Sequence, residues 1–257
     1  MIIIFLASTS LIKVDITSAQ TLEQFQVLLY TSPDRWHDLT VPVAVSQFEQ
    51  LAKKHTFGLI WAQASGSKGT KNVFSDEFLN KIDVIVFLQT KGSDLSDQQM
   101  DSFKRFIRNG AGFVGIHATS TTKNKEQWFQ KLIGRVMTLH PEEQTAVLHV
   151  ENKNHPATMH LPDHWIWTDE WYSFEEALTD NQQVLLTLDE GTYDPNRTWG
   201  DDRATAMGDF HPISWYHEYD GGRSFYTTLG HLPESYKDPV FMAHKYGGII
   251  GPQPVWV

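Results

Sequence analysis

The nine residues 110–118 read GAGFVGIHA, and this stretch decides the fold class. Residues 112–116 form an apolar run without polar alternation, which is typical of a parallel strand covered by helices on both faces. A helix is predicted directly before it. Ser96 and Gln99 have the spacing of a capping box, and Asn109-Gly110 supplies a stop. A helix that leads straight into a buried strand is typical of a βαβ unit.

Strand and helix patterns continue on both sides of this stretch, although the second half of the chain is less regular. Helices are predicted over residues 40–54 and 239–246. Strands are predicted over 26–30, 57–62, 83–88, 145–150, 184–188, 204–210 and 224–228. The sequence therefore predicts an α/β fold with a doubly wound, mostly parallel, flavodoxin-like sheet and helices on both faces.

The composition excludes several classes of partner and site. The formal charge of −10 argues against a nucleic-acid partner, because no basic stripe is available to displace counterions. The absence of cysteine excludes thiolate metal sites and a cysteine nucleophile. We also expect no nucleotide cofactor and no stable membrane insertion.

The first residues differ from the rest of the chain. Residues 2–12 are largely apolar, and Ser18-Ala19-Gln20 offers a small-residue cleavage site. We expect residues 1–19 to be a secretory signal, which implies export, and residues 20–257 to form one domain. The alternative is a buried first strand in a cytoplasmic protein, and Lys13 and Asp15 favour that alternative.

Polar residues follow several of the predicted strands, where ligands bind in open α/β sheets. These residues are His37, Thr90, His117 and His231. Residues 115–118 have the layout of a nucleophile elbow, a tight turn that exposes one side chain at the carboxyl end of a strand. We therefore expect His117 to point into the main cleft, accompanied by His37, His231 and the pair Asp169-Glu170.

Further candidates lie in the irregular half. Asp169 and Glu170 are adjacent carboxylates that could hold a cation or act as an acid. Trp171, Tyr172 and Trp215 suit stacking against sugar rings, although most tryptophans fill cores. His140 and His211 each precede a proline, which restricts the backbone before it, and Arg223 follows a hairpin turn.

The stretch 110–118 resembles the signature of the ThuA-like (trehalose utilisation) family, a branch of the class I glutamine amidotransferase-like fold. Shorter blocks in family order extend the resemblance over about residues 26–250. They are His140-Pro141, His155-Pro156, residues 169–172, residues 211–215, Gly222-Arg223 and residues 229–231. Amidotransferases carry cysteine at the elbow, so His117 excludes thiolate-dependent amidotransfer. The resemblance implies carbohydrate catabolism, with a disaccharide or an oxidised (keto) glycoside as substrate.

Two functions stay open at this point. The first is a hydrolase, lyase or isomerase with the catalytic residues His117, Asp169, Glu170, His211 and His231. Substrate binding is assigned to His37, Thr90, Trp171, Tyr172, Trp215 and Arg223. Zinc, manganese or iron could be held by His117, His140, Glu170 and His231. The second function is a non-catalytic sugar-binding module that has lost the nucleophile.

Overall fold

The computed structural model describes residues 23–32, 35–64, 73–90, 95–121, 126–199 and 202–251. The predicted secretory signal, residues 1–19, lies outside the described residues. None of the described helices is long and apolar enough to cross a membrane.

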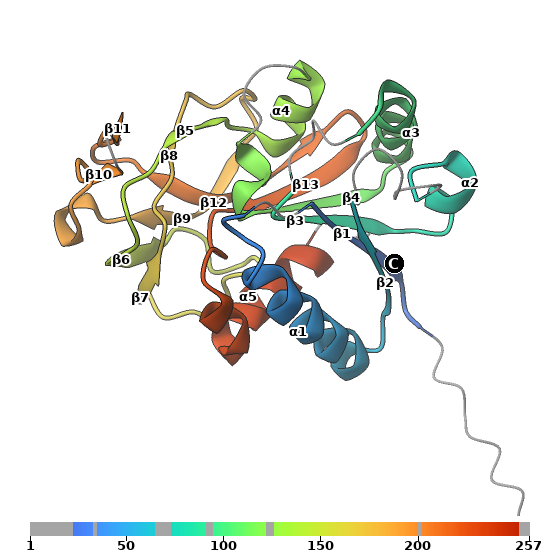
Figure 1. Cartoon of the computed structure of the whole chain (residues 1–257), viewed down its shortest axis with the longest axis horizontal. Coiled ribbons are helices and arrows are strands. Elements are labelled where there is room, and N and C mark those ends of the chain that lie inside the picture. The colour runs from blue at the N-terminus through green and yellow to red at the C-terminus, as the bar shows by residue number, and fades with distance from the viewer. Residues whose placement is uncertain are drawn as a thin grey trace, which may run out of the picture.

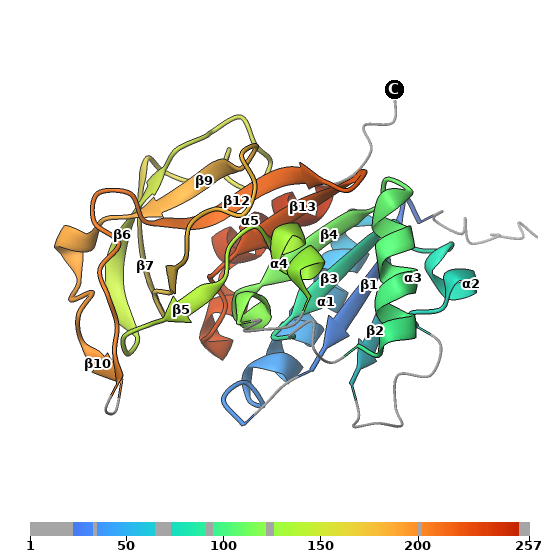
Figure 2. The ribbon, with the colours of Figure 1, turned by 90° about the horizontal axis from the view of Figure 1, so that it is seen from above.

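A nine-stranded sheet forms the centre of the molecule, in the order β2-β1-β3-β4-β13-β12-β9-β6-β7. The first five strands are parallel to one another: β2 (Gly58–Gln63), β1 (Gln26–Thr31), β3 (Val84–Leu88), β4 (Gly112–Ile116) and β13 (Gly222–Thr227). The other four continue the sheet in antiparallel fashion: β12 (Pro212–Tyr219), β9 (Gln183–Leu188), β6 (Gln144–Val150) and β7 (His164–Asp169). Figure 2 shows this antiparallel extension leading away from the parallel half. The predicted fold class is thus confirmed, with a parallel core inside a mixed sheet.

Helices cover both faces of the parallel half (Figure 1). α1 (Thr40–His55) and α5 (Pro239–Ile250) lie on one face, and α2 (Asp76–Leu79), α3 (Asp97–Arg108) and α4 (Gln127–Ile133) lie on the other. Each face has its own apolar core. Phe48 and Phe241 pack in the first core, and Phe103 and Phe129 pack in the second. Because β3 and β4 are fully buried between these cores, their sequences are apolar throughout.

The predicted capping box at the start of α3 is present. The backbone N–H of Gln99 donates to the Ser96 hydroxyl, and the backbone N–H of Ser96 donates to Gln99 Oε1 at 2.9 Å. The helix therefore starts at the residue that the sequence indicates, and it delivers the chain into β4.

The predicted strand at residues 204–210 is wrong, since the backbone there forms a loop between β11 (Asp202–Arg203) and β12. The N–H groups of Met207 and Gly208 donate to the Glu190 carboxylate at 2.7 and 2.8 Å. They are therefore not available for hydrogen bonds to a neighbouring strand. Short elements complete the irregular half: β5 (Met137–Leu139), β8 (Ser173–Phe174), β10 (Thr198–Trp199) and the 3₁₀ turns His117–Ser120, Glu190–Thr192 and Pro233–Lys237.

Candidate functional site

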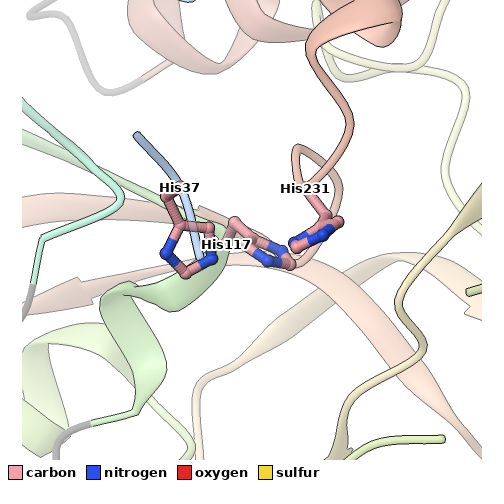
Figure 3. Close-up of side chains that lie close together, drawn as sticks. All are labelled: His37, His117 and His231. Atoms are coloured by element: carbon pink, nitrogen blue, oxygen red, sulfur yellow. The ribbon is translucent and has the colours of Figure 1, made fainter. Parts of the chain in front are cut away.

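Three histidines from distant parts of the chain meet at the carboxyl ends of the parallel strands. His37 lies in the turn before α1, His117 directly follows β4, and His231 follows β13. The ring centroid of His117 lies 5.3 Å from that of His37 and 5.3 Å from that of His231, and the His37 and His231 centroids are 5.5 Å apart. Figure 3 shows the three rings grouped together on three separate segments. The structure thus brings together the strand-end histidines that the topology predicted.

His117 has the backbone geometry of an elbow. Its φ of 54° lies in the left-handed region, which non-glycine residues adopt at a cost of about 1–3 kcal/mol. The turn is also tight, because a Cβ at Gly115 would come within 3.0 Å of the Tyr226 ring. A strained backbone of this kind persists only where the surrounding structure imposes it, and it is concentrated at functional sites.

The His117 side chain is more enclosed than the elbow pattern predicted, since it is 0% exposed. Its Nδ1 lies 2.6 Å from the carbonyl oxygen of Thr228. A carbonyl only accepts, so Nδ1 carries the proton, and in the neutral ring Nε2 presents a lone pair. This nitrogen lies 2.8 Å from the Tyr172 hydroxyl and 3.3 Å from Glu170 Oε2.

Glu170 is the anionic centre of the site. Its Oε2 lies 3.3 Å from His117 Nε2, 3.4 Å from His231 Nδ1 and 3.7 Å from His140 Nε2. Burial alone would raise the pKa of Glu170, but its interactions with the imidazoles of His117, His140 and His231 lower it to about 2. Burial lowers the pKa of His117, against the opposing effect of Glu170. Glu170 is therefore ionised throughout the physiological range, inside a set of imidazoles.

Asp169 supports this centre without joining it. Its carboxylate accepts the backbone N–H groups of Gly230 at 2.8 Å, His231 at 3.1 Å and Glu170 at 3.0 Å. Burial raises the pKa of Asp169 to about 6, and burial lowers that of the neighbouring Lys245 to about 7. Lys245 Nζ donates to the carbonyl oxygen of Leu229, on the same turn. Both side chains therefore fix the turn that carries His231.

Two residues near the site were not found from the sequence. Gln89 directly follows β3 with a φ of 52°, and its amide donates to the Gly230 carbonyl at 2.7 Å while accepting the N–H of Ala118 at 3.4 Å. It joins the turns of His117 and His231, and the strand-end rule could have indicated it. Glu143 Oε1 lies 3.3 Å from His231 Nε2, and nothing in its local sequence distinguishes it.

Several predicted site residues lie elsewhere. Three of them, Trp171, Trp215 and Thr90, are 0% exposed. The Trp171 indole donates to the Gln144 carbonyl oxygen, and the Trp215 indole donates to that of Ile133. The Thr90 hydroxyl lies within hydrogen-bond distance of the carbonyl oxygens of Tyr30 and Leu88. The protein encloses all three side chains, and their assignment to substrate binding stays a prediction. His211 is buried between Glu190, 2.8 Å from its Nδ1, and the Tyr172 carbonyl, 2.8 Å from its Nε2. Arg223 pairs in register with Gly112, at the amino end of β4. It therefore lies at the amino ends of the parallel strands, whereas the histidines lie at their carboxyl ends.

Comparisons with known proteins agree with the fold. The model of the ThuA family, described as trehalose utilisation, matches residues 26–250. A ThuA-like protein from Bacteroides uniformis superimposes with a TM-score of 0.73 at 25% identity, covering 88% of this chain and 90% of that one. A ThuA-like protein from Parabacteroides merdae gives a TM-score of 0.68 at 18% identity, covering 89% and 90%, and shows the shared fold.

A search of curated proteins gave no match. The family match spans most of the sheet, from β1 to the end of α5, and includes all of the histidines and carboxylates that meet at the strand ends. The chain belongs to the ThuA family of trehalose utilisation, and this supports a carbohydrate-related role.

Proposed function

We propose that the chain is an enzyme of carbohydrate catabolism, a lyase or hydrolase that acts on a disaccharide or keto-glycoside at the cluster around Glu170. The observation that carries the proposal is the position of Glu170 Oε2, which lies within 3.3–3.7 Å of three imidazole nitrogens. Such a set can accept a proton from a substrate and stabilise the resulting charge. A module that only bound sugar would need no buried ion of this kind, because stacking and neutral hydrogen bonds suffice.

His140 is the residue best placed to carry the proton. Its Nδ1 lies 2.9 Å from the Pro141 carbonyl oxygen, so Nδ1 is the protonated nitrogen and Nε2 is able to accept. Nε2 lies 3.7 Å from Glu170, and the side chain is 17% exposed, whereas His117 is sealed. The negative charge of Glu170, 3.7 Å from Nε2, would stabilise the imidazolium that forms.

A keto-glycoside suits this arrangement chemically. A carbonyl acidifies the adjacent C–H, so that a base can remove the proton while the electron pair moves onto the carbonyl oxygen. A neutral imidazole still donates from one ring nitrogen, so His37 or His231 could stabilise the charge on that oxygen with a hydrogen bond. Return of the electron pair would expel the glycosidic oxygen, which would take the proton held by His140 and leave as an alcohol, completing an elimination. Addition of water to the product would make the overall reaction a hydrolysis.

A turnover screen tests the proposal. Disaccharides and their keto forms would be incubated with the wild type, with His140→Ala and with His149→Ala, and product sugars would be quantified. His149 is the matched control, because it is an exposed histidine on β6 that pairs with His164. We expect His140→Ala to lower kcat by about 100-fold, and His149→Ala to leave it unchanged.

The opposite results would contradict the proposal. Tight sugar binding by the wild type without any turnover would favour the sugar-binding module. Equal turnover by His140→Ala and the wild type would remove His140 from the proton-transfer step.

A further inference from the structure

We infer that His37, His117 and His231 form a binding site for one divalent transition-metal ion of the zinc type, with Glu170 as the fourth ligand. The inference deepens the proposed function, and its catalytic meaning rests on that function, although metal binding itself does not. Each of the three histidines offers a ring nitrogen, and these nitrogens lie within 4.8 Å of one another. The three side chains come from separate segments of the chain and lie next to one another (Figure 3).

The spacing of the rings agrees with a shared ion. A zinc–nitrogen bond of about 2.1 Å places each imidazole centroid about 3.2 Å from the metal, so tetrahedral angles separate the centroids by about 5.3 Å. The observed separations are 5.3, 5.3 and 5.5 Å. The ring planes cross at 77°, 76° and 54°, so the rings are not stacked on one another.

Glu170 has the spacing of a further ligand relative to two of the three histidines. Ligand atoms about 2.1 Å from a tetrahedral ion lie about 3.4 Å from one another. Glu170 Oε2 is 3.3 Å from His117 Nε2 and 3.4 Å from His231 Nδ1. These distances are long for hydrogen bonds between a charged pair, which are usually about 2.7–2.9 Å. They are therefore closer to the spacing of two ligands than to that of a donor and an acceptor.

The nitrogens are also prepared for a metal. The Nδ1 of His117 is engaged by the Thr228 carbonyl, which fixes the tautomer that presents Nε2, as outer-shell partners of metal-binding histidines do. His231 Nδ1 is buried and has no hydrogen-bond partner in the part of the chain that the structure describes. The Tyr172 hydroxyl, 2.8 Å from His117 Nε2, can rotate away when a ligand bond forms.

The donor set indicates the class of ion. Three imidazoles and one carboxylate suit zinc and its neighbours in the first transition row, whereas magnesium and calcium prefer oxygen ligands. Three histidines are also the ligand set of one class of catalytic zinc site. A second group, Glu143, Glu170 and His231, also converges, but it is richer in oxygen and Glu143 is one-third exposed. The three-histidine set is therefore preferred.

Cobalt(II) titration of the chelator-treated full-length protein tests the inference, because bound Co²⁺ gives visible absorption bands that report its ligands. We expect one equivalent of Co²⁺ to bind and to be displaced by Zn²⁺. His37→Ala and His231→Ala should each weaken binding by about 100-fold or more, since loss of an outer-shell partner alone costs about 10–100-fold. Far-UV spectra would establish that the variants are folded.

Two matched controls locate the site. His149→Ala removes part of an exposed histidine pair elsewhere and should leave the affinity unchanged. Glu143→Gln keeps an acceptor beside His231 Nε2, so it should weaken binding by much less than His231→Ala does. A loss as large as that of His231→Ala would move the ion to the second group and overturn the inference. Absence of stoichiometric binding by the wild type, or binding unaffected by His37→Ala, would overturn it too.

The outcomes separate this inference from the proposed function. Turnover of a keto-glycoside by metal-free protein would show that the reaction does not need the metal, and the proposed enzymatic function would stand. Histidine-dependent metal binding without sugar turnover would support the metal site and contradict the proposed reaction.

Discussion

At the scale of single residues, His117 has a left-handed backbone conformation and a fully buried imidazole whose two nitrogens both make hydrogen bonds. The sequence located this residue correctly at the end of a central strand, because a polar side chain directly after an apolar run is visible in the pattern. Its burial was not visible, since it depends on Thr228 and Tyr172, which lie 111 and 55 residues away. The same reason explains Trp171 and Trp215, whose side chains the fold encloses.

The burial of His117 changes the expected result of its removal. His117→Ala should lower the free energy of unfolding by about 1–3 kcal/mol, because the Thr228 carbonyl and the Tyr172 hydroxyl lose their partners inside the protein. Urea unfolding of the variant beside His149→Ala measures this, and the exposed control should change by less than about 0.5 kcal/mol. Equal stability of His117→Ala and the wild type would mean that the buried contacts of this ring contribute nothing.

At the scale of elements, the turns after the parallel strands place the site, and the alternation of strand and helix predicted most of them. The antiparallel strands β7 and β12 were missed, because they carry polar and aromatic residues without a clear period. The failed strand at 204–210 has a specific cause. Glu190 captures its backbone donors, and no local propensity can indicate a contact with a residue 17 or 18 positions away.

The turn between β13 and the following 3₁₀ turn gives a prediction of its own. Gly230 has a φ of 142°, and a Cβ there would lie 2.6 Å from the Tyr236 hydroxyl oxygen. Gly230→Ala should therefore displace the turn that carries His231 and destabilise the protein by about 1–3 kcal/mol. Gly110→Ala is the matched control, because Gly110 also has a positive φ, of 93°, but a Cβ there would meet nothing within 4 Å.

Thermal melts and metal titration of both glycine variants distinguish the effect of backbone strain at a positive φ from the effect of displacing the turn that carries His231. We expect Gly110→Ala to lose a smaller amount of stability with the site intact, and Gly230→Ala to lose both stability and metal affinity. Identical behaviour of the two variants would show that the clash with Tyr236 does not control the position of His231.

At the scale of the whole molecule, buried histidines link folding to pH. Burial lowers the pKa of His155 to about 4, and burial also lowers the pKa of His217 and of His244. The unfolded chain takes up these protons near pH 6.5, and the folded chain does so only at lower pH. Between these values the unfolded state binds more protons, so stability falls as the pH falls from about 6.5 to 4.

His155 makes this dependence testable. Its shift corresponds to at most about 3 kcal/mol over that window, and the ring stacks on Tyr216 while its Nδ1 accepts the N–H of Ala157. His155→Gln keeps an acceptor and removes the titration, so the stability difference between pH 7 and pH 5 should shrink. Urea unfolding at both pH values measures it. His164→Gln, at the exposed end of β7, should retain the dependence of the wild type, and an unchanged dependence in His155→Gln would contradict this assignment.

The most direct test of the central claim is the turnover of Glu170→Gln on a sugar that the wild type converts. The substitution keeps the size of the side chain and removes only the charge on which the imidazoles converge. We predict that kcat falls by about 100-fold or more while the melting temperature changes by only a few degrees, because the packing is preserved. Wild-type turnover in a folded Glu170→Gln protein would contradict the claim that this cluster is the reactive centre.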